Sequence, residues 1–313
     1  MIIAAHFQFT YTFATHLTTN MYYFVYGLLY LLSLLPWFII YAIADFVYVI
    51  IYYVLKYRRD IVMQNLSIAF PEKSEEEKKI IAKEFYHNLV DAFIETVKML
   101  SITKKELQKR VMGPYENLNN LHGSGQNVQI HLGHFFNWEL GSAALASKSL
   151  YPILVVYMPV KNKIFDRLFL HLRSRFGNKM IAATKFKEEF LPYKSKAFAL
   201  ALVGDQNPGV PQKAYWSPFF GKMAPFVTGP EKGAKTNNAI VLMSNVYKVK
   251  RGHYAFELEL LTKEPHSMKE GEITRRFIDF VEESVRRHPA NYLWSHRRWK
   301  HEFDAEKYKD LII

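Results

Sequence analysis

The chain contains no cysteine. This absence excludes a disulfide framework, a metal centre with thiolate ligands and a cysteine nucleophile. Internal repeats and low-complexity stretches are also absent, whereas 50% of the residues are hydrophobic and 16% are aromatic. A mainly disordered protein is excluded, because so many apolar side chains can bury a sizeable core. The 313 residues suffice for two average domains, or for one large α/β domain with an additional segment.

Charged residues are nearly absent from the run Tyr22–Leu55, in which Asp45 is the only charged side chain. A helix rises about 1.5 Å per residue, so about 20 apolar residues cross the hydrocarbon core of a bilayer. Pro36 is expected to divide the run, which places a membrane-spanning helix near residues 37–55. The alternative is a buried core helix, although core helices seldom continue this far without polar residues.

The two flanks of this run differ. Lys56, Arg58 and Arg59 follow it, and positive charge behind a membrane-spanning helix predicts that the subsequent chain lies in the cytoplasm. Residues 1–20 precede it and mix Thr, His and aromatic residues without a period. We interpret residues 1–20 as a gene-model extension, with Met21 as the natural start.

Positive charge dominates the chain, with 41 Lys and Arg against 29 Asp and Glu and a net charge of +12. Such a surplus favours an anionic partner. Nucleic acid, an acidic membrane surface and an acidic carrier protein all satisfy this condition. Composition does not choose among them.

Strands and helices alternate in the second half of the chain. Before them, Ser74 and Glu77 form a capping box that predicts a helix of about 25 residues. From residue 112 the alternation predicts an α/β fold with a mixed central sheet flanked by helices. The expected strands are 127–131, 152–158, 179–182, 197–203, 240–249 and 254–261, and the expected helices are 138–148, 163–175, 186–193, 229–237 and 272–287.

The segment from His131 to Glu139 carries the strongest chemical signal. It runs from a strand end into a helix that Asn137 is placed to cap. With His134 on the loop and Glu139 in the first helical turn, the loop can bring the carboxylate to the imidazole. The carboxylate would then fix the tautomer, and the other ring nitrogen would serve as a general base.

Two rivals to this pair exist. His301 and Glu306 have the same spacing, but they lie in a charged tail without a preceding strand, so we interpret that match as coincidence. His131 is a second candidate base, ranked behind His134 because a residue within a strand end is more often packed than catalytic. No His and acid cluster has the spacing of a metal site, so no metal is expected.

Three further segments carry candidate binding residues. Arg173 and Arg175 lie at the end of a helix and are suited to bind a phosphate or an oxyanion. The alternative is that they are solvent-exposed and only interact favourably with the helix dipole. Asp205 and Gln206 follow a buried strand, where α/β sites usually form, although Asn-Pro-Gly after them also suits a plain turn. The segment 292–300 interleaves cations and aromatic residues, which suits a phosphorylated headgroup or nucleic acid.

Together these residues resemble the late acyltransferases of lipid A biosynthesis, from about Met21 to Lys300. No single landmark is specific, but their order and spacing are. The landmarks are the amino-terminal apolar run, Arg58-Arg59, Asn65-Leu66, Ala69-Phe70-Pro71, Gly133-His134-Phe-Phe-Asn-Trp-Glu139, Arg175-Phe-Gly177, Gly204-Asp205-Gln206-Asn207-Pro208-Gly209, Phe219-Phe220-Gly221, Thr228-Gly229-Pro230 and Tyr292-Leu-Trp-Ser-His296-Arg297-Arg298-Trp299-Lys300.

The resemblance implies a bacterial inner-membrane enzyme with a single membrane span, a catalytic domain on the cytoplasmic face and a fold similar to the glycerolipid acyltransferases. It would transfer a fatty acyl chain from acyl carrier protein to a hydroxyl of a phosphorylated lipid A precursor, with no cofactor and no nucleic acid. Its catalytic pair falls on His134 and Glu139. The functional arginine of the family falls on Arg175, with Arg173 as the alternative. Its functional aspartate falls on Asp205.

The remaining site residues implied as substrate, oxyanion or phosphate contacts are Gln206, Thr228, His296, Arg297 and Arg298. Two positions depart from the family pattern, because Asn207 replaces a frequent second acid and Ser295 a frequent leucine. Since no residue resembles an acyl-enzyme nucleophile, direct transfer is expected. The alternatives are another lysolipid or aminolipid acceptor, or a membrane-tethered binding protein without turnover.

The expected organisation follows from these assignments. It comprises the extension 1–20, a membrane anchor at 21–58, a helical linker region at 59–111, an acyltransferase domain at 112–301 and a charged tail at 302–313.

Overall fold

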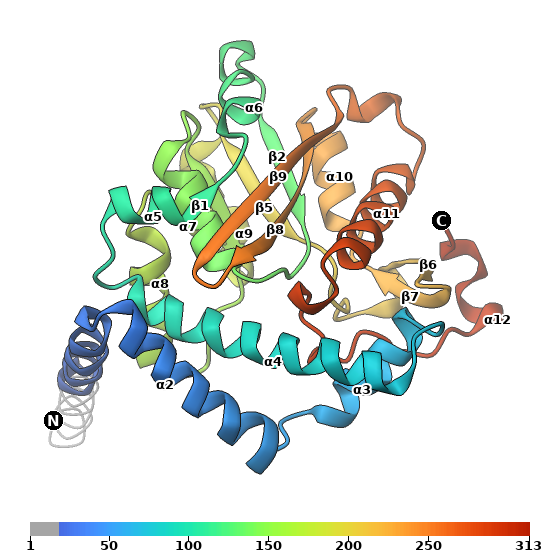
Figure 1. Ribbon diagram of the computed structural model, residues 1–313. Helices are drawn as coiled ribbons and strands as arrows, with labels where there is room; N and C mark the ends of the chain where they lie inside the picture. The colour runs from blue at the N-terminus through green and yellow to red at the C-terminus, as the bar shows by residue number, and fades with distance from the viewer. Residues whose placement is uncertain (1–18) are drawn as a thin grey trace, which may run out of the picture.

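The computed structural model describes residues 19–313 and contains a mixed sheet with helices on both faces (Figure 1). The predicted extension 1–20 lies almost entirely outside the described residues. The strands are β1 (Val111–Met112), β2 (Val128–Leu132), β3 (Ile153–Tyr157), β4 (Lys179–Ala182), β5 (Ala199–Val203), β6 (Tyr215–Phe219), β7 (Lys222–Phe226), β8 (Ile240–Lys250) and β9 (His253–Thr262).

Residues 19–34 are helical, and the labelled helices follow. They are α2 (Trp37–Val49) with its π-helical continuation η1 (Ile50–Val54), α3 (Arg59–Ala69), α4 (Glu75–Lys98), α5 (Lys104–Arg110), α6 (Tyr115–Asn119), α7 (Trp138–Lys148), α8 (Lys163–Ser174), α9 (Phe186–Phe190), α10 (Gly229–Thr236), α11 (Glu272–Arg287) and α12 (Ala305–Tyr308). Short 3₁₀ turns lie at His122–Ser124, Ala183–Lys185, Leu191–Tyr193, Pro211–Lys213, Pro265–Ser267, Pro289–Asn291 and Lys309–Leu311.

The central sheet has the strand order β1-β9-β8-β2-β5-β3-β4. All neighbours are parallel except β8 and β9, which form an antiparallel hairpin. Its turn at Arg251 and Gly252 requires the left-handed region, and Gly252 adopts it with a φ of 73°. The predicted mixed α/β sheet is therefore confirmed, and each helix and strand predicted from residue 127 onward forms within a few residues of its expected position.

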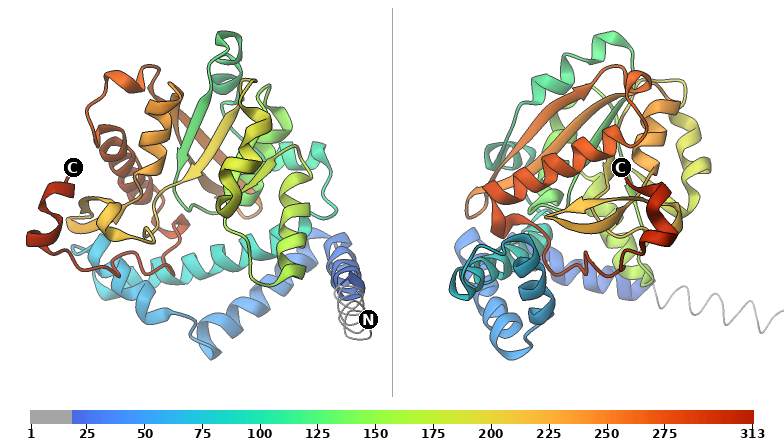
Figure 2. Two further views of the ribbon diagram at one scale, coloured as in Figure 1. Left: turned by 180° about the vertical axis from the view of Figure 1, so that it is seen from behind. Right: turned by 90° about the vertical axis from the view of Figure 1, so that its right-hand side faces the viewer.

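Helices cover both faces of the sheet (Figure 2). Successive strand residues point to opposite faces, so Ile130 packs in one core with Leu140 of α7, whereas His131 meets Phe277 of α11 edge to face. Helices α7 and α8 thus cover one face, and α9, α10 and α11 cover the other. The two layers enclose the strand ends from which the site is built.

Helix α4 begins at the predicted capping box. The Ser74 hydroxyl accepts a hydrogen bond from the Glu77 N–H, and the Glu77 carboxylate accepts one from the Ser74 N–H. These bonds satisfy backbone donors that the first helical turn leaves unpaired. The helix then continues for 24 residues beneath the sheet (Figure 1) and carries buried polar groups in its second half.

Helix α2 packs antiparallel along α4. Near its start the Tyr41 hydroxyl donates to Glu95 of α4, and further along Tyr48 stacks on His87. The stretch Trp37–Val54 is the one helix within residues 19–313 that is long and apolar enough to cross a membrane. One side of it is buried on α4, whereas Phe38, Phe46 and Val54 on the other side are exposed. The membrane span predicted at 37–55 therefore stays a prediction.

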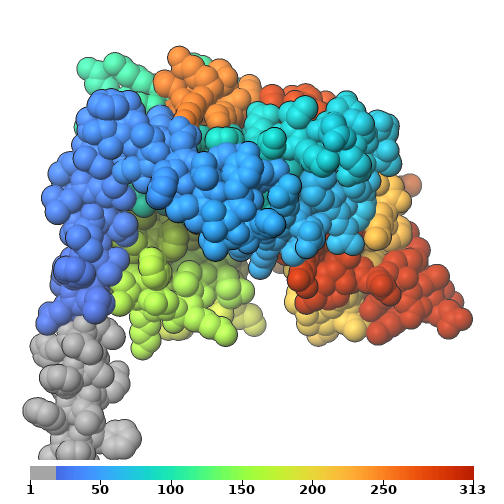
Figure 3. All heavy atoms as spheres, turned by 60° about the horizontal axis from the view of Figure 1, so that its bottom comes forward, coloured from blue at the N-terminus to red at the C-terminus, as the bar shows by residue number. Residues whose placement is uncertain are grey.

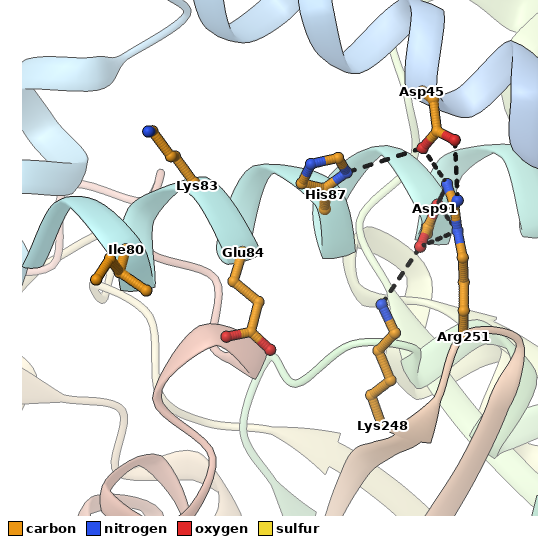
Figure 4. Close-up of a pocket in the computed structure, with 8 residues that line it drawn as sticks. All are labelled: Asp45, Ile80, Lys83, Glu84, His87, Asp91, Lys248 and Arg251. Atoms are coloured by element: carbon orange, nitrogen blue, oxygen red, sulfur yellow. Dashed lines mark hydrogen bonds and ion pairs between the residues drawn. The ribbon is translucent and has the colours of Figure 1, made fainter. Parts of the chain in front are cut away.

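A charged cluster fastens α2 to the domain (Figure 4). Arg251, at the tip of the β8–β9 hairpin, binds Asp45 of α2 and Asp91 of α4, with shortest nitrogen–oxygen distances of 2.6 and 2.7 Å. Lys248 approaches the Asp91 carboxylate at 3.4 Å, and His87 lies 3.9 Å from Asp45. The side chain of Asp91 is only 2% exposed. Arg251 thus joins three elements that are far apart in the sequence.

Replacing Arg251 by alanine is expected to lower the free energy of unfolding by about 3 kcal/mol, because it removes the main partner of a buried carboxylate. Arg287→Ala is the matched control, since Arg287 and Glu257 form a pair that is 41% and 33% exposed. Such pairs contribute at most about 1 kcal/mol. Chemical denaturation of both variants in detergent measures the difference, and equal small losses would contradict the structural role of Arg251.

The carboxyl-terminal segment packs against α3 and the small β6–β7 sheet. The Asn65 side-chain amide donates to the carbonyls of Trp294 and His296, both at 2.7 Å, and the Arg58 guanidinium donates to the Ser295 carbonyl at 3.0 Å. Two segments singled out in the sequence, around Arg58-Arg59 and Tyr292–Lys300, are therefore partners in space. Helix α3 lies within the helical region predicted at 59–111, whereas the β6–β7 hairpin was not expected from the sequence.

Candidate active site

The site forms where β2 and β5 end. These strands are adjacent and parallel, with Leu132 opposite Val203. His134 and Asp205 each follow two residues later in the chain, so both leave the sheet at the same edge. Carboxyl ends of parallel strands are the usual place for sites in α/β folds.

Asp205 holds His134 through two hydrogen bonds. Its Oδ1 lies 2.6 Å from Nδ1 of the imidazole, and its Oδ2 accepts the His134 backbone N–H at 2.9 Å. With the carboxylate as acceptor, Nδ1 carries a proton and Nε2 of a neutral ring is left as a base. The buried Tyr292 side chain also interacts with the carboxylate and favours its ionised form. The geometry therefore fixes both the tautomer and the orientation of His134.

The charge of Asp205 is stabilised in spite of its complete burial. Burial opposes ionisation, but the neighbouring His134 charge and the hydrogen bonds lower the pKa of Asp205 to about 2. The carboxylate is consequently ionised at neutral pH. It can stabilise an imidazolium on His134 after that ring has accepted a proton.

The predicted contact between His134 and Glu139 is wrong. Glu139 binds Arg173 of α8 instead, with its Oε1 2.6 Å from Nη2 and its Oε2 3.0 Å from Nε. The Trp138 indole also donates to Glu139 at 3.1 Å. Helix α7 starts at Trp138 as expected, but Asp205 binds Nδ1 of the imidazole and the Arg173 guanidinium binds the Glu139 carboxylate.

Glu139 and Arg173 nevertheless lie in the same cavity as His134. Burial opposes the charge of Arg173, but the bidentate contact with Glu139 raises the pKa of this guanidinium. Arg173 therefore stays charged. Its Nη1 makes no hydrogen bond to any residue between 19 and 313.

The cavity has a volume of about 500 Å³ and separates polar from apolar groups. His134, Glu139 and Arg173 meet at its polar part, together with Gln206 and Asn207 from the loop after β5. Its apolar part extends between the sheet and the helices α7 and α8. That part is lined by Ile130, Leu145, Ile153, Val155, Val246 and Phe256.

Two of the predicted binding arginines face away from this cavity. Arg175 donates to the carbonyls of Met99 and Ile102 at 2.6 and 2.7 Å, and so ties the end of α8 to the loop after α4. Arg298 is 1% exposed and donates to the Asn207 side chain and the Pro225 carbonyl. Of the two arginine candidates in the α8 segment, the structure places Arg173 at the site and Arg175 in the framework.

The other predicted contacts lie around the site. Gln206 lines the cavity, whereas His296 lines a second one and accepts a long hydrogen bond of 3.4 Å from the Asn207 N–H. Burial lowers the pKa of His296 to about 4. Arg297 is exposed, and Thr228 is half-buried at the amino end of α10. The rival base His131 is buried away from the cavity, and burial lowers its pKa to about 4.

One buried acid at the back of the site was not singled out in the sequence. Glu95 of α4 accepts hydrogen bonds from Asn137, Tyr254 and Tyr41 at 2.9, 2.7 and 2.9 Å. Asn137 is the residue that caps α7, through a bond from the Leu140 N–H. Glu95 thereby links the loop 133–137 to α2, α4 and β9. No local pattern predicts this role, because Glu95 sits in an ordinary helical sequence.

Glu95 gives the stability of the fold a defined pH dependence. Burial raises its pKa from 4.5 to about 7. The folded state therefore keeps its proton where the unfolded chain has lost it, so the free energy of unfolding should fall as the pH rises from about 4.5 to 7. Denaturation at a series of pH values should show this fall in the native chain and a weaker one in Glu95→Gln. An identical slope in both would contradict it.

Comparisons with known proteins show the family of the chain. Residues 9–301 match the family model described as bacterial lipid A biosynthesis acyltransferase. The chain is 26% identical to the lipid A biosynthesis palmitoleoyltransferase of Escherichia coli, covering 79% of this chain and 80% of that protein. It is 25% identical to the lauroyltransferase of the same organism, covering 88% and 89%, and 24% identical to a lipid A biosynthesis acyltransferase of Haemophilus influenzae, covering 76% and 74%.

The family match extends over nearly the whole described fold, including the amino-terminal helices, the sheet and the chain up to residue 301. It confirms the resemblance drawn from the sequence landmarks and the prediction of an acyltransferase over that of a binding protein without turnover. The chain belongs to the bacterial lipid A biosynthesis acyltransferases.

Proposed function

We propose that the protein transfers a fatty acyl chain from acyl carrier protein to a hydroxyl of a phosphorylated lipid A precursor, without a covalent acyl-enzyme. The observation that carries this proposal is the imidazole of His134, held by Asp205 at the polar part of an apolar cavity. A lipid hydroxyl has a pKa far above neutrality, so it needs a positioned base when it attacks.

In this mechanism His134 accepts the hydroxyl proton as the oxygen attacks the thioester carbonyl. The new carbon–oxygen bond forms, the carbon–sulfur bond breaks, and the imidazolium returns the proton to the departing thiolate. Asp205 stabilises the imidazolium between these steps, because it remains ionised next to Nδ1. The proton transfers of this cycle therefore involve only the two substrates and this pair.

Arg173 is the donor best placed to stabilise the oxyanion. The backbone N–H groups of residues 134–136 are committed, since His134 donates to Asp205, Phe135 to the Gly133 carbonyl and Phe136 to the Asn291 carbonyl. Arg173 lines the cavity with an Nη1 that has no hydrogen-bond partner in the described part of the chain. Glu139 retains a catalytic role here by aiming the guanidinium at the reacting carbonyl.

The apolar part of the cavity suits the acyl chain of the donor. Leu145 of α7 is one of its walls and is itself buried. We expect Leu145→Phe to change the ratio of kcat/KM between long-chain and short-chain donors by at least about 10-fold, because each methylene excluded from the cavity costs about 0.8 kcal/mol.

The matched control for this variant is Leu168→Phe, which enlarges a buried leucine of α8 outside the cavity. The measurement is transfer from donors of graded chain length. A chain-length profile that is the same in both variants would place the donor chain elsewhere.

We infer that the enzyme works on the cytoplasmic face of the bacterial inner membrane and that α2 and η1 lie along the membrane surface. If this helix crossed the bilayer, α4 and the hairpin tip would follow it, and Asp91 and Arg251 would enter the hydrocarbon region. Its exposed apolar side contacts lipid in this arrangement. The net charge of +12 suits both an anionic lipid and an acidic carrier protein.

An assay of the purified protein tests the proposal. Acyl carrier protein and coenzyme A thioesters are compared as donors, and the lipid A precursor is compared with lysophospholipid and aminolipid acceptors. Transfer to the lipid A precursor from the carrier-protein thioester supports the proposal. Transfer only to another lipid would agree with the proposed acyl transfer but contradict the proposed lipid A acceptor.

A further inference from the structure

A second cavity, of about 540 Å³, adjoins the catalytic one. The two share Trp138 and Gln206 as lining residues. Trp138 meets the imidazole of His134 edge to face, with ring centroids 5.7 Å apart. Trp138 therefore lies at the boundary of the two cavities and contacts His134 of the first.

The lining of the second cavity has an apolar wall and a cationic side. Ile51 and Leu55 from the end of η1, and Leu89 and Phe93 from α4, form the apolar wall. Arg58 and His296 stand on the other side. An apolar wall beside a permanent cation fits an amphiphile with an anionic headgroup.

The position of the cavity favours a ligand that arrives from the membrane. Leu55 and Phe93 are 66% and 61% exposed, so the wall continues into the exposed apolar side of η1. Figure 3 shows the face that carries α2, with a notch between the segment around α8 and the carboxyl-terminal segment. Because the Arg251 cluster fastens α2 to α4 (Figure 4), this wall has a fixed position.

We propose that this second cavity is the binding groove of the acyl acceptor. The acceptor's acyl chain lies along Ile51, Leu55, Leu89 and Phe93, its phosphate lies at Arg58, and its hydroxyl passes Trp138 to reach His134. This assignment rests on the proposed function, and it explains how one base serves a ternary complex. Donor and acceptor enter from opposite sides of Trp138 and meet at the imidazole.

Phe93→Asp tests the apolar wall. An exposed position tolerates the change, but the carboxylate would have to lose water when a lipid chain binds beside it. We expect the KM for the lipid A precursor to rise about 10-fold, with little change in kcat and in the KM for the acyl donor, as for a loss of uniform binding. The matched control is Ile80→Asp, because Ile80 is 65% exposed on the same helix but lies outside the groove.

Arg58→Gln tests the cationic side with a second readout. The native enzyme should have a higher kcat/KM for the phosphorylated precursor than for its dephosphorylated form. In the variant, the logarithm of this kcat/KM ratio should fall by at least about half. The same KM for the lipid A precursor in Phe93→Asp and Ile80→Asp would contradict binding of the acceptor in the second cavity. An unchanged preference for the phosphorylated precursor in Arg58→Gln would contradict it as well. If the native protein transfers no acyl chain to any lipid, the proposed function itself fails, and this result is separate from the variant comparisons.

Discussion

Replacing His134 by alanine will reduce kcat for acyl transfer by about 10² to 10⁴-fold, the range typical of a lost general base. In the proposed mechanism the imidazole is the base at the polar part of the cavity, and alanine leaves the acceptor hydroxyl without a proton acceptor. The fold should survive, because His134 is a partly exposed loop residue whose backbone N–H can still bind Asp205. Transfer assays with saturating donor and acceptor measure the loss.

The control for this variant is His131→Gln, three residues earlier in the same segment. His131 lies within the buried strand β2, and its Nε2 is 2.9 Å from the Gln129 side chain. The change should leave kcat within a few-fold of the native value, whatever it does to stability. A similar loss in both variants would show that disturbing β2 is sufficient, and that the base was assigned to the wrong residue.

Replacing Asp205 by asparagine will lower kcat by about 10²-fold or more, since the amide cannot stabilise the imidazolium or enforce the correct tautomer. The side chain keeps nearly the same volume in a fully buried position. The KM for each substrate should change little, because Asp205 acts through His134. Glu139→Gln provides the comparison, since it weakens the Arg173 contact and leaves the His134 carboxylate in place.

Local patterns were sufficient to predict much of the fold. The Ser74–Glu77 capping box marks the start of α4 within one residue, and Asn137 caps α7 as expected, because both signals depend only on residues three positions apart. The alternating segments from β2 to α11 were identified for the same reason. The bounds of α3 within the predicted helical region 59–111 were not identified, since the helix begins after the left-handed Arg58. The β6–β7 hairpin was missed, since it contains Pro218 and Pro225.

The partners of the site residues could not be obtained from local spacing. His134 and Asp205 are 71 positions apart in the sequence and meet only because β2 and β5 are neighbours in register. The five-residue spacing to Glu139 is local, but the arginine of α8 competes for that carboxylate. Once strand order is known, two residues at equal distance beyond paired strand ends are expected to be neighbours.

The role of α2 shows the same limit. Its composition indicates a membrane span, and nothing near Asp45 in the sequence points to Arg251, which lies 206 positions away. One side of this apolar helix packs against the rest of the domain, and the other side is exposed. Hydropathy alone cannot separate a helix that crosses a membrane from one that lies on it.

The pH dependence of kcat in the native enzyme and in Asp205→Asn tests the central claim most directly. If His134 is the base and Asp205 stabilises its protonated form, removal of that negative charge moves the acidic limb of the profile to lower pH by at least about one unit. The acidic limb of Glu139→Gln should stay in place. An acidic limb that moves in Glu139→Gln and not in Asp205→Asn would contradict the pairing of His134 with Asp205.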